Sequence, residues 1–344
     1  MKPRTETLPV GHSSELLLQH AAHVSDQLYL LNKRKPLHSQ PAFPAEEFNI
    51  LKEAGFFELS LPGQPLDFHK PDTSALLQLL KLIGRGNLAV GRIYEGHINA
   101  LFLVHLFAQR QQQERWYRDV SLAGHLMGVW NTEAADGVSI QIRKDGQYEL
   151  QGAKTFCSGA GFVHRPIISG KLISPSGEDL GWQMCVLPLD RHQAPIDPAF
   201  WKPLGMNDSL SYKMDFTGMV LDEMDLFCKP CDYHQQPYFS GGAIRFAAVQ
   251  LGGAEAIYDA TRRYLQDLNR TEEPYQRMRL GEMAVLIELG NLWIQEAGRK
   301  ADQALSSDTF IKCFKGKINM LGFVFGRNYN DQTQVRMRKR MSWK

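Results

Sequence analysis

The chain has 344 residues, enough for two or three domains with a substantial core, and its 43% hydrophobic and 22% charged residues are typical of a globular protein. Its formal net charge of +2 predicts no polyanionic partner, so we expect no nucleic acid. Five cysteines in so long a chain argue against a disulfide framework and fit a reducing compartment. The N-terminus has no apolar core, and no apolar run is long enough to cross a bilayer. We therefore expect a cytoplasmic protein without a membrane span.

The spacing of hydrophobic residues changes twice along the chain. Apolar residues three and four apart predict helices with one buried face over residues 16–31, 76–83 and 90–107. Between residues 122 and 226 the pattern becomes short alternating runs broken by Pro and Gly, which is typical of strands. Helical spacing returns over residues 246–268 and 280–301. The predicted order is helical, then β, then helical.

A tight hairpin is expected near the start of the β region. Ser139–Ile142 and Tyr148–Leu150 alternate in polarity, and an Asp-Gly pair at residues 145–146 is a strong turn signal between them. The turns on either side of this hairpin, around Thr132 and Ser158, are therefore expected at the same end of a sheet.

Both of these turns combine a hydroxyl group with an aromatic residue. A flat heteroaromatic ring needs an apolar slab for its face and a few hydrogen-bond donors at its polar edge. Trp130 and Phe156 could supply the slab, and Thr132 and Ser158 the donors. The alternative is that Thr132 and Ser158 are ordinary turn residues at strand ends.

Four stretches, in the expected order, resemble the acyl-CoA dehydrogenase superfamily. Thr132-Glu133 followed by residues 152–158 is similar to the family's Thr-Glu-Pro turn and its Gly-x-Lys-x-Trp-Ile-Thr/Ser strand. The other three resemble the family's early helix, its last β-domain strands and its Ala/Gly-rich helix, and they are residues 43–56, 204–216 and 247–254. The resemblance spans about residues 40–305 of this chain.

The resemblance implies an α+β multidomain fold. We expect an N-terminal α-helical domain at residues 1–120, a central β-barrel-like or sandwich domain at 121–235, and an incomplete C-terminal four-helix-bundle domain at 236–310. Residues 311–344 form an atypical basic tail, which a truncated or frame-shifted C-terminus or a genuinely different tail would explain. In the family the bundle also forms the subunit interface, so a homodimer or homotetramer is expected.

The resemblance also implies FAD, bound at the β-domain and the subunit interface. Thr132 would donate to the pyrimidine edge of the ring and Ser158 near the N5 atom that accepts the hydride. Arg270 would reach the cofactor pyrophosphate of a neighbouring subunit, or it is a solvated residue at a helix end. The family's phosphate-supporting Gly-Ser-Asp is replaced at residues 136–138, which weakens the case for tight pyrophosphate binding. The other expected cofactor-binding residues flank the donors and are Trp130, Asn131, Phe156 and Cys157.

The family's dehydrogenation chemistry needs a carboxylate base, and the sequence does not identify one. Of the two positions where family members carry it, one corresponds to Gly242 and the other should lie beyond residue 340, after the likeness has ended. Glu95 and His97, on a helix that borders the family's substrate cavity, could be substitute proton-transfer groups. The alternative is a satisfied core histidine and a capping or exposed glutamate. No metal site is expected, because the C-x-x-C at residues 228–231 stands alone.

Three functions are consistent with these features. The first is α,β-dehydrogenation of an acyl thioester of coenzyme A or a carrier protein in lipid metabolism, with hydride transfer to flavin N5 and a separate electron acceptor. The second is a flavin-dependent monooxygenase on the same fold, which needs no Glu base and receives reduced flavin from a reductase. The third is a catalytically silent, truncated flavin- or acyl-binding relative. The resemblance favours them in that order.

Overall fold

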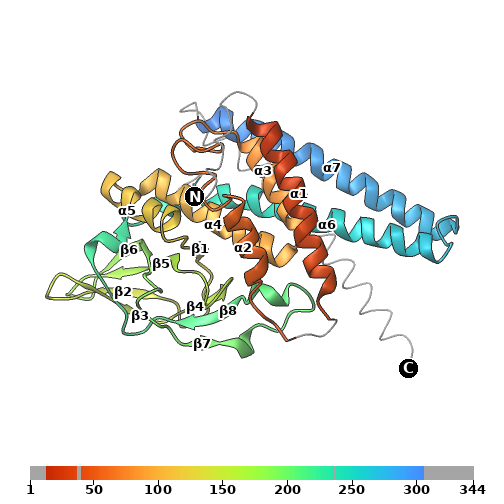
Figure 1. Ribbon diagram of the computed structural model, residues 1–344. Coiled ribbons are helices and arrows are strands. Elements are labelled where there is room, and N and C mark those ends of the chain that lie inside the picture. The colour runs from red at the N-terminus through yellow and green to blue at the C-terminus, as the bar shows by residue number, and fades with distance from the viewer. Residues whose placement is uncertain (1–12, 37–39, 235–237, 306–344) are drawn as a thin grey trace, which may run out of the picture.

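The computed structural model describes residues 13–36, 40–234 and 238–305, and Figure 1 shows how they are arranged. The described chain begins with helices α1 (Ser13–Arg34), α2 (Ala45–Glu53), α3 (Thr73–Gly86), α4 (Leu88–Phe107) and α5 (Arg110–Ser121). It ends with two long helices, α6 (Tyr238–Asp267) and α7 (Pro274–Leu305). The basic tail expected at residues 311–344 lies outside the described residues.

The described strands between α5 and α6 are β1 (Met127–Trp130), β2 (Ser139–Ile142), β3 (Tyr148–Gln151), β4 (Ala153–Cys157), β5 (Arg165–Ile173), β6 (Asp179–Val186), β7 (Ile196–Asp197), β8 (Tyr212–Asp215), β9 (Val220–Leu221) and β10 (Leu226–Phe227). One sheet has the order β10-β6-β5-β2-β3-β9, with β1 also paired to β5, and the other has the order β4-β8-β7. The predicted order, helical then β then helical, is confirmed. The division into three domains stays a prediction.

The predicted hairpin is confirmed, because β2 and β3 pair antiparallel from Ser139 with Gln151 to Ile142 with Tyr148. Strands β1 and β2 both pair in parallel with β5, β1 along its first half and β2 along its second. The opposite edge of β5 pairs with β6. The chain therefore leaves the sheet after β1, forms a turn over residues 131–138, and returns to the same edge as β2.

Helix α4 connects the helical part to the larger sheet, because it packs against α3, α6 and β1. The side chain of Asn87 caps its start by accepting hydrogen bonds from the backbone N–H groups of Ala89 and Val90. The helix has apolar residues on all of its faces, as expected for a helix that is buried on all sides. The hydrophobic spacing does not predict α5, because most of its surface is polar and its buried residues are Gln112, Trp116 and Val120.

Small residues let α6 approach α3 closely, as the Ala/Gly-rich run predicts. A Cβ atom on Gly84 would lie 2.3 Å from the Val249 carbonyl oxygen, and one on Gly252 would lie 1.9 Å from the Lys81 carbonyl oxygen. Larger residues at either position would force the helices apart. Beyond this contact, α6 and α7 project from the body as a long antiparallel hairpin (Figure 1).

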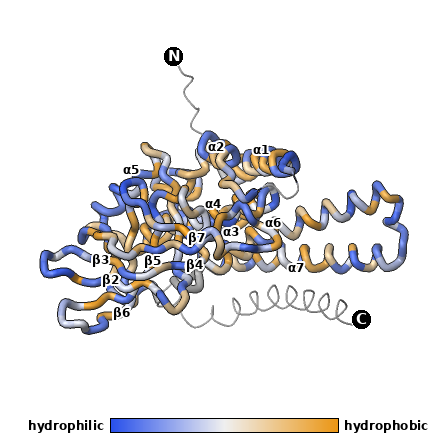
Figure 2. Tube along the Cα trace, turned by 90° about the horizontal axis from the view of Figure 1, so that it is seen from below, coloured by the Kyte–Doolittle hydropathy of each residue, from blue (hydrophilic) through white to orange (hydrophobic). Residues whose placement is uncertain are grey.

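The projecting hairpin carries apolar bands along its length (Figure 2). The apolar side chains on it that are at least 43% exposed are Ile257, Tyr264, Leu268, Tyr275, Met278, Val285, Leu286, Leu289 and Leu292. An exposed apolar surface of this extent marks an interaction site in a soluble protein.

His97 joins α4 to two neighbouring segments. Its Nδ1 atom accepts the backbone N–H of Met127, at the start of β1, over 3.0 Å. Its Nε2 atom therefore carries the proton and donates it to the carbonyl oxygen of Phe57, 2.9 Å away. The ring is fully buried, and burial lowers its pKa from 6.5 to about 4. His97 is thus held in its neutral form.

The burial of neutral His97 predicts a specific loss of stability in mild acid. Below the ordinary pKa of histidine, His97 is protonated in the unfolded chain but stays neutral in the folded chain. The free energy of unfolding therefore falls as the pH drops from about 6.5 towards 4. Between about pH 7.5 and about pH 5, His97→Gln should lose about 1–2 kcal/mol less unfolding free energy than the wild type in urea titrations. His23→Gln, at an exposed position on α1, is the matched control. An identical loss in the wild type and His97→Gln would show that His97 does not contribute.

Candidate functional site

The two turns singled out in the sequence lie side by side. The backbone N–H of Thr155 donates to the carbonyl oxygen of Thr132 at 2.8 Å. The indole N–H of Trp130 donates to the carbonyl oxygen of Ser158 at 3.0 Å. The two turns are therefore adjacent, but β1 and β4, which lead into them, belong to different sheets, so the expectation that both lie at the same end of one sheet is wrong in that detail.

A buried ion pair fixes the first turn to strand β4. The Lys154 side chain is 0% exposed, and its ammonium lies 2.5 Å from the Glu133 carboxylate and 3.4 Å from the Asn131 carbonyl oxygen. An ammonium without solvent is costly unless a counter-charge stays beside it. Glu133 is therefore held in place, and the Asn131–Glu133 turn with it.

Ser158 belongs to a chain of three buried hydroxyl groups. Its Oγ atom lies 2.8 Å from Oγ of Ser211, which lies 2.9 Å from Oγ of Ser209. Each serine is at most 6% exposed. Each hydroxyl has one proton, so if Ser209 donates to Ser211 and Ser211 to Ser158, the Ser158 proton is free for a further acceptor. The chain can therefore present a polarised donor at the second turn.

The segment that supplies Ser209 and Ser211 is strained and anchored. It contains a 3₁₀ turn, η2 (Asn207–Ser209), flanked by Met206 and Leu210 with φ values of 59° and 43°. Left-handed backbone at residues other than Gly persists only where the surroundings enforce it. Lys35, at the end of α1, bonds Asp208 of this turn at 2.8 Å and also Glu47 of α2 at 3.1 Å. The N-terminal helices thus hold the serine segment.

The aromatic surface at the site differs from the expected one. Phe156 is 47% exposed, has a φ of 55°, and meets Phe200 and Trp201 edge-on, with ring centroids 5.0 and 6.0 Å away. The indole nitrogen of Trp201 is buried without a hydrogen-bond partner. Trp130 is only 2% exposed and packs against Phe216, so its position does not support the expected role as a slab. Its indole positions Ser158 instead.

The other expected cofactor residues occupy different environments. Thr132 is exposed on the first turn. The Asn131 amide nitrogen donates to the Tyr233 hydroxyl at 3.0 Å, while its buried carbonyl oxygen has no partner. Cys157 is fully buried, donates to the Lys154 carbonyl oxygen at 3.4 Å, and has a pKa raised by burial, so it offers no reactive surface.

The two proton-transfer candidates on α4 have contrasting surroundings. Both ring nitrogens of His97 are taken by backbone groups, which matches the satisfied-core alternative and leaves no ring atom for a substrate. Glu95 is neither a cap nor exposed. It is 3% exposed and pairs with Arg92 at 2.7 Å, and burial raises its pKa although Arg92 and Arg245 oppose this.

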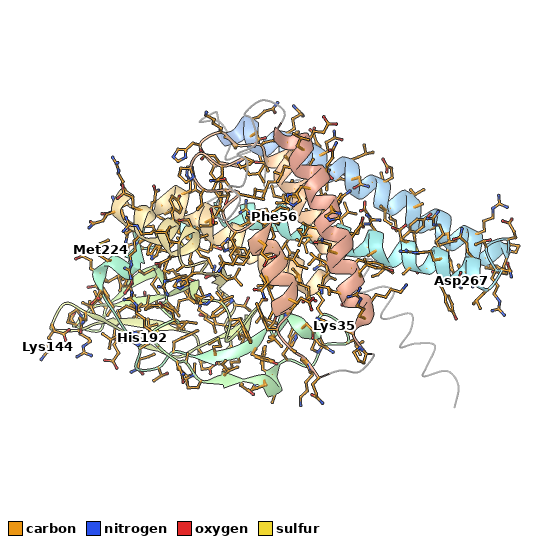
Figure 3. The ribbon with its side chains drawn as sticks, in the orientation of Figure 1. Lys35, Phe56, Lys144, His192, Met224 and Asp267 are labelled. Atoms are coloured by element: carbon orange, nitrogen blue, oxygen red, sulfur yellow. The ribbon has the colours of Figure 1, made fainter. Side chains whose placement is uncertain are left out.

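Arg270 lies far from both turns within the chain. It is exposed in the connection between α6 and α7. Figure 3 shows Asp267, three residues earlier, at the tip of the projecting hairpin and Lys144 of the β2–β3 hairpin at the opposite end of the molecule. Strands β1 and β4, which lead into the turns, lie in the β part of the molecule, away from this tip (Figure 1).

These turns fit an isoalloxazine ring. Phe156 and its aromatic neighbours provide exposed apolar faces, and the hydroxyl chain provides a donor at Ser158. The unpartnered carbonyl oxygen of Asn131 provides an acceptor. An aromatic face with a few convergent polar groups is what such a ring requires.

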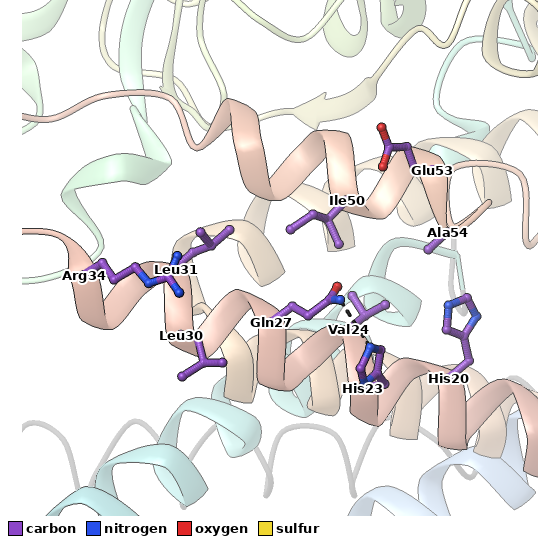
Figure 4. Close-up of a pocket in the computed structure, with 10 residues that line it drawn as sticks. All are labelled: His20, His23, Val24, Gln27, Leu30, Leu31, Arg34, Ile50, Glu53 and Ala54. Atoms are coloured by element: carbon purple, nitrogen blue, oxygen red, sulfur yellow. Dashed lines mark hydrogen bonds between the residues drawn. The ribbon is translucent and has the colours of Figure 1, made fainter.

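A cavity elsewhere does not contain these residues. It measures about 550 Å³ and lies between α1 and α2 (Figure 4). Its lining residues are His20, His23, Val24, Gln27, Leu30, Leu31, Arg34, Ile50, Glu53 and Ala54. Within the described part of the chain there is no cluster of His, Cys, Asp or Glu fit for a metal ion. Nor do the described helices include one long and apolar enough to cross a membrane.

Sequence reasoning missed Phe200, Trp201, Ser209, Ser211, Tyr233 and Arg245. Most are distant in sequence from the two turns and meet them only in the fold. Arg245 is the exception, because it follows Gly242 by one helical turn and a charged residue there was a readable signal.

Sequence comparisons identify distant relatives. The chain is 24% identical over 284 residues to a probable FMNH2-dependent monooxygenase, SfnC, of Pseudomonas putida, a match covering 77% of this chain and 69% of that protein. It is 23% identical over 271 residues to a dibenzothiophene monooxygenase of Rhodococcus qingshengii, covering 72% of this chain and 64% of that protein. The chain thus spans about two thirds of the length of these curated relatives. No family model matches it.

Solved structures share the architecture. TdsC of Paenibacillus sp. A11-2, in a complex with FMN and indole, superposes with a TM-score of 0.73 at 20% identity, over 85% of this chain and 77% of that one. Butyryl-CoA dehydrogenase of Megasphaera elsdenii superposes with a TM-score of 0.73 at 16% identity, over 87% and 82%. The resemblance drawn from the sequence is thereby confirmed, and the chain has the fold of the acyl-CoA dehydrogenase superfamily.

Proposed function

We propose that this chain is a flavin-dependent monooxygenase that receives reduced flavin from a separate reductase and uses oxygen to oxidise a small molecule. This is the second of the three functions consistent with the sequence. The curated relatives are named as monooxygenases, which favours it over thioester dehydrogenation. They lend no support to an acyl-CoA substrate or a role in lipid metabolism.

The observation that carries this proposal is that helix α6 has a glycine, and one turn later a cation, where a dehydrogenase would have a carboxylate base. By the resemblance, Gly242 occupies one of the family's two base positions, and a Cβ atom there would already lie 2.9 Å from the amide nitrogen of Asn99. One turn later the buried charged residue is Arg245, a cation. A cation cannot remove a proton from carbon, so this wall of the site does not suit α,β-dehydrogenation. Monooxygenation makes no such demand.

The residues at the turns would hold the ring and orient it. Phe156 would contact its face, Thr132 its pyrimidine edge, and Ser158 the N5 edge. When bound, reduced flavin supplies the two electrons with which one oxygen atom enters the substrate and the other leaves as water. The buried Ser158 hydroxyl would stabilise negative charge at that edge of a bound ring, because a low dielectric strengthens its hydrogen bond. Glu95 remains the candidate for proton transfer.

The residues at positions 136–138, where the family binds the cofactor phosphates, favour FMN over the FAD expected from the resemblance. A Cβ atom on Gly137, where the family has a phosphate-supporting Ser, would lie 2.4 Å from the carboxyl carbon of Glu133. The adjacent Asp136 carboxylate is neutralised by Lys213. A site that lacks this hydroxyl, and whose nearby cations Lys213 and Lys154 are already paired with carboxylates, is poorly suited to a pyrophosphate.

We further propose that a second copy of the chain covers the α6–α7 hairpin, in a homodimer or homotetramer, and brings its Arg270 to the flavin phosphate. The exposed apolar surface of the hairpin supports this, since a second copy would remove it from water. The distance of Arg270 from the turns of its own chain supports it as well. The division into helical, β and helical domains at residues 1–120, 121–235 and 236–310 belongs to the same proposal.

The two enzymatic functions give opposite results in one experiment. Under anaerobic conditions, butyryl-CoA or palmitoyl-CoA should leave bound oxidised FMN unbleached, because Gly242 supplies no base and the loss of a general base costs about 10²–10⁴-fold in rate. With NADH, FMN and a flavin reductase in air, isotopically heavy oxygen should enter a product from a panel that contains dibenzothiophene, indole and benzenesulfinate. Rapid anaerobic bleaching would instead establish dehydrogenation and make Glu95→Gln the next variant. If the flavin is not bleached and no labelled product forms, the third function, a catalytically silent flavin- or acyl-binding relative, is supported.

Removal of the Ser158 hydroxyl should weaken flavin binding. Ser158→Ala should raise the Kd for oxidised FMN by about 3–10-fold, because one buried hydrogen bond to the ring is lost. Ser211→Ala should produce part of this effect, since it breaks the hydroxyl chain. Ser139→Ala, in strand β2, is the control and should change the Kd less than about twofold. Fluorescence titration measures all four proteins, and equal effects of Ser158→Ala and Ser139→Ala would remove Ser158 from the site.

The cofactor phosphate should depend on Arg270. We expect FMN to bind more tightly than FAD, and Arg270→Gln to weaken FMN binding by about tenfold or more, because a charge-assisted phosphate contact is lost. Arg277→Gln, at an exposed position on α7, is the control. Sedimentation velocity should show that Arg270→Gln keeps the oligomeric state. Unchanged FMN binding in a preserved oligomer would contradict the role given to Arg270.

A further inference from the structure

Arg245 is a buried cation with incomplete partners. Its side chain on α6 is 4% exposed, and its Nη2 atom donates to the Asn99 carbonyl oxygen on α4 at 2.6 Å. The guanidinium lies over the ring of Phe102, 4.6 Å from the centroid. Its Nε atom is buried and has no hydrogen-bond partner. A buried guanidinium with a neutral amide, a ring face and an unused donor lacks an anion.

The neighbouring charges do not supply that anion. Glu95 is within electrostatic range of Arg245, but its carboxylate is paired with Arg92 at 2.7 Å. Arg92 and Arg245 together carry two positive charges, and Glu95 carries at most one negative charge. These three side chains therefore carry an excess positive charge, and of the two cations Arg245 is the buried one, whereas Arg92 is 25% exposed.

Tyr233 connects Arg245 to the turn that carries Asn131 and Thr132. Tyr233 lies within electrostatic range of the guanidinium, and its hydroxyl is 3.0 Å from the amide nitrogen of Asn131. The Asn131 carbonyl oxygen is buried without a partner. With the amide turned over, its nitrogen takes that place and can donate to an oxyanion, so in the site proposed below Asn131 is a donor to an acid and not an acceptor for the ring. Asn131 immediately precedes Thr132, so the cluster borders the proposed ring site.

We propose that Arg245, Asn99, Asn131 and Tyr233 form a recognition site for the oxyanion of a small organic acid, a carboxylate, sulfinate or sulfonate. The proposal rests on the proposed function and names the substrate class of the same site. The oxyanion would accept hydrogen bonds from Nε of Arg245 and complete its charge. The remainder of the molecule would then lie towards the flavin turn, where it is oxidised. A glycine at position 242 and a cation at 245 thus suit binding of an acid.

The test is calorimetric titration of the flavin-free protein and of the protein loaded with oxidised FMN. The probes are benzenesulfinate and benzoate, with methyl phenyl sulfone and benzamide as uncharged analogues. The anions should bind at least about tenfold more tightly than the analogues, and Arg245→Gln should weaken anion binding by at least about 30-fold. Arg262→Gln, exposed on the same helix, is the control and should change nothing.

A second variant guards against misfolding of Arg245→Gln. Asn99→Asp places a carboxylate beside the guanidinium with almost no change in volume, so it should abolish anion binding while the melting temperature is kept or raised. Equal affinity for charged and uncharged probes, no binding of any anion, or anion binding retained in both variants would overturn the site. Anion binding without oxygenation would support the anion site and contradict the proposed monooxygenase function. Oxygenation of neutral substrates alone would support the monooxygenase function and contradict the anion site.

Discussion

A lysine ammonium without solvent contact fixes the first of the two turns on which the candidate site depends. Lys154 can be buried on β4 only because Glu133 lies against it, and this fixes the turn that carries Asn131 and Thr132. The same carboxylate leaves no room for a side chain at Gly137. In this chain the position of the family's phosphate-supporting serine is thus filled by the carboxylate that pairs with Lys154.

The second turn depends on contacts from outside the β region. Phe156, Met206 and Leu210 all have positive φ values, and such residues each cost about 1–3 kcal/mol unless the surroundings enforce them. Lys35 provides part of that enforcement, because it bonds both the strained segment and α2. The N-terminal helices thus hold in place the chain of three serine hydroxyls, which ends at Ser158, directly after β4. A site built in this way is sensitive to changes in helices that do not touch the cofactor.

Two polar side chains on α4 have both lost contact with water, but they are compensated for that loss to different extents. His97 and Glu95 are two residues apart and so face different neighbours. His97 meets backbone groups from two segments, and every hydrogen bond it can make as a neutral ring is made. Glu95 instead faces a group of side-chain charges that do not balance. The first arrangement stabilises the packing of α4 on β1, whereas the second leaves the protein ready for a charged ligand.

The sequence by itself determined the order of helices and strands, the β2–β3 hairpin, the close packing of the Ala/Gly-rich helix and the meeting of the two turns. These features depend on local periodicity, turn residues and small side chains, all of which are readable along the chain. It did not reveal α5, whose buried residues are few, or that Trp130 is buried while Phe200 and Trp201 lie beside Phe156. The serine chain and the incomplete partners of Arg245 were equally hidden. Such features depend on which distant segments meet and on which polar atoms are left over when they do, and only the tertiary structure decides that.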